Sequence, residues 1–187
     1  MQSTSTLELA LAGLLQQKPQ SGYDLRKSFA TMAMRHYSDS PGSIYPALRR
    51  METRGWITSD PQVAAGTEDA RRRRVFSVTA EGAAALVAWM EQPVTRDDIV
   101  SRISGLMLRF AFMDGNVLRA TALRFLEQFE RELGLHVSEL LKPSWEEMKS
   151  KFPVHTGVLA FQSGIQAMEA QLAWARQAHA WLREDEQ

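Results

Sequence analysis

Residues 38–56 carry the most restrictive local pattern of the chain, and the rest of the sequence has to fold around it. Ser40 and Ser43 are each suited to cap a helix, because a serine oxygen accepts an amide proton that the first turn leaves unpaired. The apolar residues of the next turns recur at helical spacing and predict a buried stripe: Ile44, Leu48 and Met51. Gly55 suits the end of this helix, since glycine tolerates the left-handed cap conformation.

The opposite face of the predicted helix is polar and basic: Ser43, Tyr45, Arg49 and Arg50. A helix with a narrow apolar stripe, small residues at its start and a basic outer face fits a DNA groove. A plain surface helix with solvated arginines has the same pattern. The residues after Gly55 decide between these two interpretations.

Two strands are predicted after Gly55. Residues 56–59 are rich in aromatic and β-branched side chains and residues 75–79 alternate, whereas residues 60–70 have no apolar period and are expected to form a loop. The four arginines at 71–74 repel one another unless an anion lies opposite them. A charge run is usually a solvated face, but this one lies in a hairpin directly after a candidate recognition helix. Its position favours a wing that contacts DNA.

Two helices are expected before the central one. Thr6 is suited to cap the first, residues 18–22 break it, and Ser21 opens the second. Three helices joined by short polar turns match the helix-turn-helix layout.

A fourth helix begins after Thr79 and ends near residues 92–95, where Pro93 marks the best domain boundary. Beyond this boundary the patterns are helical throughout. We therefore expect a mainly α fold with a small β-hairpin. A winged helix-turn-helix domain is predicted over residues 1–93, and a helical domain is predicted over residues 94–187.

The last predicted helix, about residues 156–184, carries a heptad seam. Two interpretations of the seam stay open, which are packing within the chain's own bundle and packing against a second copy. We favour the second copy, because tryptophans lie beside the seam and the short domain offers little other helix to cover it. The expected dimer interface consists of Ile165, Met168, Leu172, Trp174, Ala175, Trp181 and Leu182.

The composition excludes several classes of function. The chain of 187 residues has no cysteine, which excludes disulfides and thiolate chemistry, and its 4 histidines lack metal-ligand spacing. The sequence also lacks a linked nucleophile and base, a carboxylate pair and a phosphate-binding glycine loop, which are signatures of enzymes. We therefore expect no enzymatic activity, no cofactor and no metal.

The distribution of charge is more informative than the net charge, which is zero. Residues 21–80 hold ten Lys and Arg against six Asp and Glu, a balance of +4, whereas residues 94–187 hold eleven against thirteen, a balance of −2. A basic N-terminal half suits a polyanionic partner.

The apolar run Leu7–Leu15 is not expected to be a signal peptide, because Glu8 interrupts it and no basic residue precedes it. The sequence also lacks a stretch of the roughly 20 apolar residues that a membrane span needs. We expect a soluble cytoplasmic protein without a membrane partner.

Three blocks of the sequence resemble the PadR family of transcriptional regulators. They are Ser-Gly-Tyr-Asp-Leu at 21–25, Ser-Pro-Gly-Ser-Ile-Tyr-Pro-Ala-Leu-Arg-Arg-Met-Glu at 40–52, and Arg-Arg-Val-Phe-Ser-Val-Thr-Ala-Glu-Gly at 73–82. The blocks occur in the family's order and span essentially residues 1–93. The length of the remaining chain resembles the larger subgroup, which includes virulence-gene activators.

The sequence departs from the family pattern at Tyr37, Met51 and Trp56, where the family more often has tryptophan, leucine and leucine. All three residues keep an apolar role. The resemblance implies a winged-helix DNA-binding domain followed by a helical dimerisation domain. The C-terminal half resembles the family only in length and helical pattern, so the identity of an effector is not carried over.

The resemblance and the residue pattern together predict a homodimer on double-stranded DNA. Its two recognition helices would lie about 34 Å apart, so the operator should be an inverted repeat. Tyr45 and Arg49 are candidates for contacts to base edges, and Arg50 for a phosphate. Tyr23 resembles a family tyrosine that contacts the DNA backbone or braces the fold. The full predicted set is Tyr23, Ser40, Gly42, Ser43, Tyr45, Arg49, Arg50, Arg72, Arg73 and Arg74.

The expected function is therefore sequence-specific regulation of transcription, with repression as the first expectation. Two alternatives stay open, which are an activator of the same fold and a ligand-sensing or interaction module that no longer binds DNA. A small-molecule effector of unknown identity also stays open.

Overall fold

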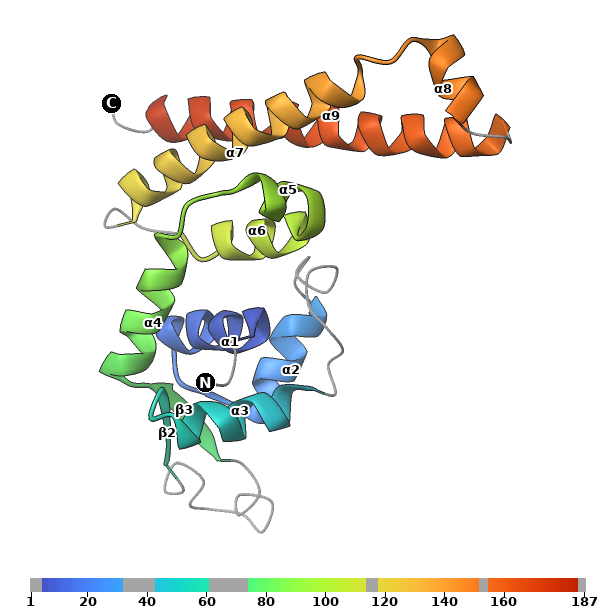
Figure 1. The fold of residues 1–187 in the computed structure, drawn as a ribbon. Coiled ribbons are helices and arrows are strands. Elements are labelled where there is room, and N and C mark those ends of the chain that lie inside the picture. The colour runs from blue at the N-terminus through green and yellow to red at the C-terminus, as the bar shows by residue number, and fades with distance from the viewer. Residues whose placement is uncertain (1–4, 32–42, 61–73, 114–117, 152–154, 185–187) are drawn as a thin grey trace. The chain divides into compact units, whose positions relative to one another are not determined.

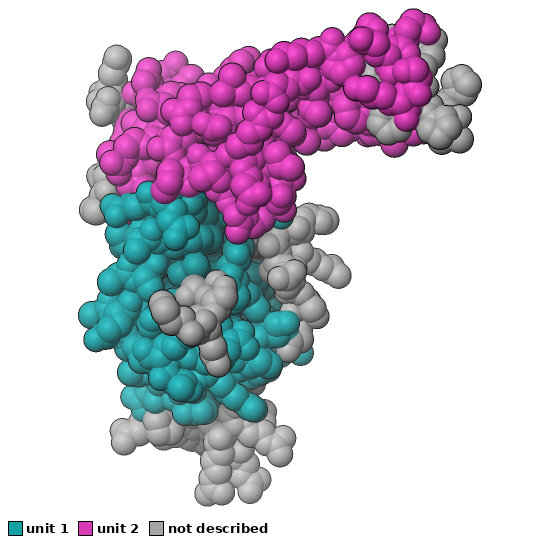
Figure 2. Space-filling view, viewed as in Figure 1, with its two compact units in different colours: residues 1–92, 104–113 teal, residues 93–103, 114–187 magenta. Residues whose placement is uncertain are grey.

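The computed structural model describes residues 5–31, 43–60, 74–113, 118–151 and 155–184. The chain divides into two compact units. The first contains residues 1–92 and 104–113, and the second contains residues 93–103 and 114–187 (Figure 2). The second unit thus begins at Pro93, next to the predicted boundary, but residues 104–113 belong to the first unit, which the sequence did not indicate.

The first unit combines helices with a small sheet (Figure 1). Its helices are α1 (Thr6–Gln17), α2 (Gly22–Thr31), α3 (Ile44–Thr53), α4 (Ala80–Met90) and most of α6 (Ile103–Phe110). Its strands are β1 (Gln20–Ser21), β2 (Ile57–Asp60) and β3 (Val75–Val78), in the antiparallel order β1-β3-β2. The prediction of a mainly helical fold with a small hairpin is confirmed, and the pairing of Ile57 with Val78 begins the register of that hairpin. The strand β1 was not predicted.

The helix α1 forms the core of the first unit. It contacts α3, α4 and β3, and its residues are buried continuously from Leu7 to Leu15. A helix that is buried on every side is expected at the centre of a domain. Its cap is Ser5 rather than the predicted Thr6, because the Ser5 side chain accepts the amide proton of Glu8 at 3.3 Å.

Of the other predicted helix caps in the first unit, those at Ser21 and Gly55 are confirmed and that at Ser43 is not. Ser21 accepts the amide proton of Asp24 at 3.1 Å and thus caps α2 as predicted. Gly55 has a φ of +74°, which confirms its left-handed conformation after α3. Ser43 precedes α3, but its side chain makes no capping hydrogen bond, because its backbone is already helical, with a φ of −85° and a ψ of −7°.

The second unit consists of helices in the part that the structure describes: α5 (Arg96–Ser101), α7 (Arg119–Leu140), α8 (Trp145–Lys151) and α9 (His155–Glu184). The helices α7 and α9 lie side by side (Figure 1). Buried residues of α7, such as Phe129 and Leu133, face the predicted heptad seam of α9. Within the seam, Ile165, Leu172 and Ala175 are buried in the chain itself.

The remaining seam residues are more accessible. Met168 and Leu182 are half-buried. Trp174 is 36% exposed and meets the ring of Phe129 edge to face, with 6.4 Å between the ring centroids, whereas Trp181 is 65% exposed. The first interpretation of the seam, packing within the chain, therefore accounts for its most buried members, and the tryptophans form its exposed side.

An ion pair between Arg96 and Glu139 joins α5 to α7 at the surface of the second unit. The hydrogen bond from Arg96 lowers the pKa of the Glu139 carboxyl below its usual value. None of the described helices is both long and apolar enough to cross a membrane. Likewise, no cluster of three or more potential metal ligands occurs among the described residues.

The start of α4 fits closely against the backbone between α3 and β2. A Cβ atom at Gly82 would lie 2.1 Å from the backbone oxygen of Trp56, which cannot move away easily. We therefore expect Gly82→Ala to lower the free energy of unfolding by about 1–3 kcal/mol. Gly105→Ala is the matched control, because nothing lies within 4 Å of that position in α6, and it should stabilise the helix by about 0.5–1 kcal/mol. Urea unfolding of both variants measures the difference, and equal stability would contradict it.

Candidate nucleic-acid interface

A hollow of about 230 Å³ lies where α2, α3 and β3 meet. Four of its lining residues belong to the predicted DNA-contacting set: Tyr23, Tyr45, Arg49 and Arg74. The others are Ser21, Gly22, Leu48, Glu52 and Phe76. The fold therefore brings together predicted residues that are up to 51 positions apart in the sequence (23 to 74). The two tyrosines are about half exposed, 53% for Tyr23 and 51% for Tyr45.

The ring of Tyr45 lies against the start of α2 at Gly22. A Cβ atom added to Gly22 would lie 2.7 Å from the Cε1 atom of Tyr45, so a larger residue at position 22 would make this half-exposed ring shift. Ser21, which caps α2, lines the same hollow. The direction of the Tyr45 ring therefore depends on the small residue that opens α2.

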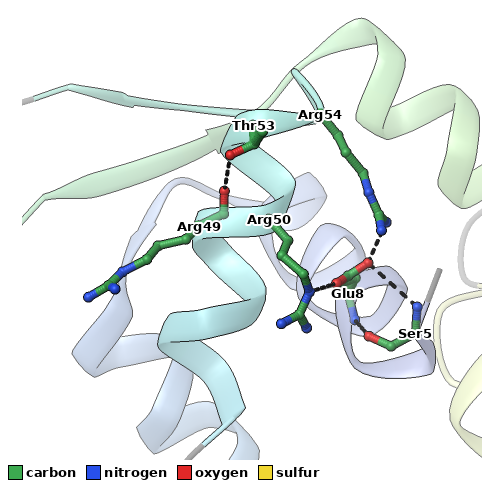
Figure 3. A network of polar contacts seen from close by, with 6 residues as sticks. All are labelled: Ser5, Glu8, Arg49, Arg50, Thr53 and Arg54. Carbon is green, nitrogen blue, oxygen red and sulfur yellow. Dashed lines mark hydrogen bonds and ion pairs between the residues drawn. The ribbon is translucent and has the colours of Figure 1, made fainter. Parts of the chain in front are cut away.

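Arg49 lies one turn after Tyr45 on α3 and is exposed. Its backbone oxygen accepts a hydrogen bond from the Thr53 hydroxyl at 3.0 Å, and its side chain extends away from that of Arg50 (Figure 3). The guanidinium makes no hydrogen bond or ion pair with any other residue that the structure describes. Its planar set of donors is thus available for a bidentate contact to a guanine or a phosphate.

Arg74 joins the β2–β3 hairpin to α3. Its Nη2 atom donates to the Glu52 carboxylate at 3.1 Å and to the Ser59 hydroxyl at 2.6 Å, and that hydroxyl donates to the same Glu52 oxygen at 2.7 Å. The guanidinium also lies over the ring of Phe76, 5.9 Å from its centroid. The Arg74 side chain is 60% exposed, so this ion pair orients the wing more than it stabilises the fold.

Arg50 does not line the hollow. Its Nε atom donates to Glu8 Oε1 at 2.6 Å, and the Nη1 atom of Arg54 donates to Glu8 Oε2 at 2.6 Å (Figure 3). The Glu8 side chain is only 1% exposed. Sequence reasoning missed this cluster: the charged residue within the apolar run at 7–15 indicates a buried charge, but it does not identify the partners of that charge.

Ser43, which is also in the predicted set, does not line the hollow. Ser43 lies at the start of α3 and is half-buried. Ser40, Gly42, Arg72 and Arg73 lie outside the described residues.

We compared the sequence and the structure with known families and proteins, and a family model matches the part of the chain that forms the hollow. Residues 11–88, which include the whole of the hollow, match the model of the transcriptional regulator PadR-like family. A relative among curated proteins is the transcriptional regulator Rv3488 of Mycobacterium tuberculosis, which is 45% identical over 50 residues, or 27% of this chain. The chain matches 43% of the length of that regulator.

Several solved structures are similar to the chain at low identity. The structure of Bacillus subtilis PadR in complex with operator DNA is 21% identical, with a TM-score of 0.44 over 97% of this chain and 99% of that one. The structure of the Vibrio cholerae virulence activator AphA is 20% identical, with a TM-score of 0.39 over 95% of this chain and 98% of that one.

Proposed function

We propose that the chain, which matches the PadR-like family of transcriptional regulators through residues 11–88, reads double-stranded DNA with the face of α3 that borders the hollow. The observation that carries this proposal is the convergence of Tyr23, Tyr45, Arg49 and Arg74 from two helices and the wing. An enzymatic role is not expected of a family of transcriptional regulators.

The side chains that line the hollow are suited to different contacts with DNA. Arg49 is exposed beside Tyr45 and can pair bidentately with the O6 and N7 atoms of a guanine in the major groove. Tyr23 and Tyr45 carry hydroxyl groups that donate to phosphates or base edges. Arg74 directly precedes β3, at the end of the arginine run. A basic wing at this place can bind the phosphates beside a groove.

We further propose that two copies act together on an inverted repeat. One α3 helix of 10 residues is about 15 Å long and reads only a few base pairs, so a second copy is needed for specificity. Trp181 and the exposed side of Trp174 support a shared surface on α9, because large exposed aromatic residues are enriched at interfaces. Ile165, Leu172 and Ala175 would then stabilise α9 on α7 within each copy.

Repression is the mode that we propose first, because a dimer that covers promoter DNA blocks transcription without any further contact. An activator would need an additional surface for the transcription machinery. The rival from another class, a sensing module that no longer binds DNA, does not account for an exposed Arg49 beside two tyrosines.

The first experiment concerns Arg49. A preferred site is selected from random duplexes with the wild-type protein, and binding of Arg49→Ala is measured by fluorescence anisotropy on this site and on an unrelated duplex. We expect a loss of about 1–3 kcal/mol on the preferred site and a smaller loss on the unrelated one, because only the preferred site offers the bidentate pair. Arg102→Ala removes an exposed arginine of the second unit and should change neither.

Equal losses of binding free energy on both duplexes would show that Arg49 contacts a phosphate instead of a base. Wild-type protein that selects no duplex from the random pool would contradict DNA binding and favour the sensing module.

The second experiment concerns assembly. Sedimentation equilibrium should show a dimer of the wild-type chain at micromolar concentration. Trp181→Ala should weaken dimerisation by about 2 kcal/mol, which is typical of an aromatic residue at the centre of an interface. Val87→Ala, an exposed apolar change on α4, is the control that should leave it unchanged. A wild-type monomer that still binds its selected site tightly would overturn this part of the proposal.

A further inference from the structure

Glu8 is a charged group inside the core of the first unit. It lies on α1 between Leu7 and Leu9, and its side chain is 1% exposed. A carboxylate in such a place destabilises the fold unless it is fully paired, because burial removes its hydration. Each of its oxygens has its own partner, because Arg50 binds Oε1 and Arg54 binds Oε2, both at 2.6 Å. The amide of Ser5 lies 3.5 Å from Oε2 and closes the capping box.

Arg50 lies on α3, and Arg54 caps the C-terminal end of that helix. Arg50 and Arg54 are four residues apart, as are Tyr45 and Arg49, so each pair forms its own stripe along the helix. The stripes are separated by about 100°, the rotation per residue of an α-helix. Figure 3 shows the consequence, since the Arg50 and Arg54 side chains converge on Glu8 while the Arg49 side chain points elsewhere.

Two contacts on one fixed carboxylate restrict the rotation of α3 about its own axis. Apolar packing of Leu48 and Met51 holds the helix on the core but is not directional, whereas charge-assisted hydrogen bonds are. The opposite edge of the helix is held by Glu52, which binds Ser59 and Arg74. The direction in which Tyr45 and Arg49 face the hollow is therefore set from both edges of α3.

We propose that Glu8 is a positioning residue for DNA recognition, which acts through Arg50 and Arg54 and touches no DNA itself. This inference rests on the proposed function. It also gives Arg50 and Arg54 a role other than direct contact with bases, since both bind Glu8 and neither lines the hollow. Glu8 precedes the residues that match the family model, so the positioning contact comes from outside the matched region.

The test compares Glu8→Gln with the wild-type chain on two duplexes, which are the site selected by the wild type and an unrelated duplex of the same length. The ratio of the two affinities is measured at a temperature well below the thermal unfolding midpoint of each variant. We expect the ratio to fall about tenfold, within the range of coupling between charges of one network. Glu139→Gln breaks the ion pair with Arg96 in the second unit and should leave the ratio unchanged.

A double-mutant comparison separates positioning from a general loss of structure. In a chain that carries Arg50→Ala and Arg54→Ala, the further change Glu8→Gln should not alter the ratio again, because its partners are already absent. A purely structural role would instead lower the folded fraction and weaken both duplexes equally, which would overturn the inference.

If Glu8→Gln does not fold, Arg54→Ala replaces it, since this variant keeps Arg50 on the carboxylate and removes one of the two contacts. Its ratio should also fall, although Arg54 does not line the hollow. An unchanged ratio in the folded variant overturns the inference while the proposed function stands. Wild-type protein that selects no duplex overturns the proposed function itself, and the inference fails with it.

Discussion

The first unit depends on the buried carboxylate of Glu8. Most of α1 is apolar and supplies the surface on which α3, α4 and β3 pack, but apolar contact alone fixes no unique orientation. Glu8 adds direction, because it is held to α3 at two points, 42 and 46 residues further along the chain. Replacing a buried ion pair by apolar residues is often neutral or stabilising in proteins, so stability alone gives little reason to keep one. Orientation of the helix is the role that this geometry supports.

The hollow depends on this arrangement. With α3 held at both edges, Tyr45 lies against Gly22 of α2 and Arg49 faces outward beside it. Glu52 and Arg74 connect the same helix to the hairpin, so Arg74 and Arg49 line one surface. A protein that recognises DNA needs such a fixed set of donors, because contacts to bases specify a sequence only when their register is held.

Local signals made much of this fold predictable. The buried stripe of α3, the left-handed Gly55 and the hairpin follow from spacing, from glycine chemistry and from β-branched residues close together in the sequence. The pairing of Glu8 with Arg50 and Arg54 was not predictable, because no local rule relates residues on separate helices. The heptad of α9 shows the same limit, since the repeat marks a buried stripe but does not say whether α7 or a second copy covers it. The strand β1 has only 2 residues, too few for any period.

The central claim is that the face of α3 with Tyr45 and Arg49 meets the bases of the bound duplex. Site-specific photo-crosslinking tests it most directly, with benzoylphenylalanine in place of Tyr45 and, as the control, in place of the exposed Val87 on α4. The account predicts crosslinks from position 45 to bases within the selected site and none from position 87. A chain that binds the duplex with unchanged affinity but crosslinks from position 87 and not from position 45 would contradict it.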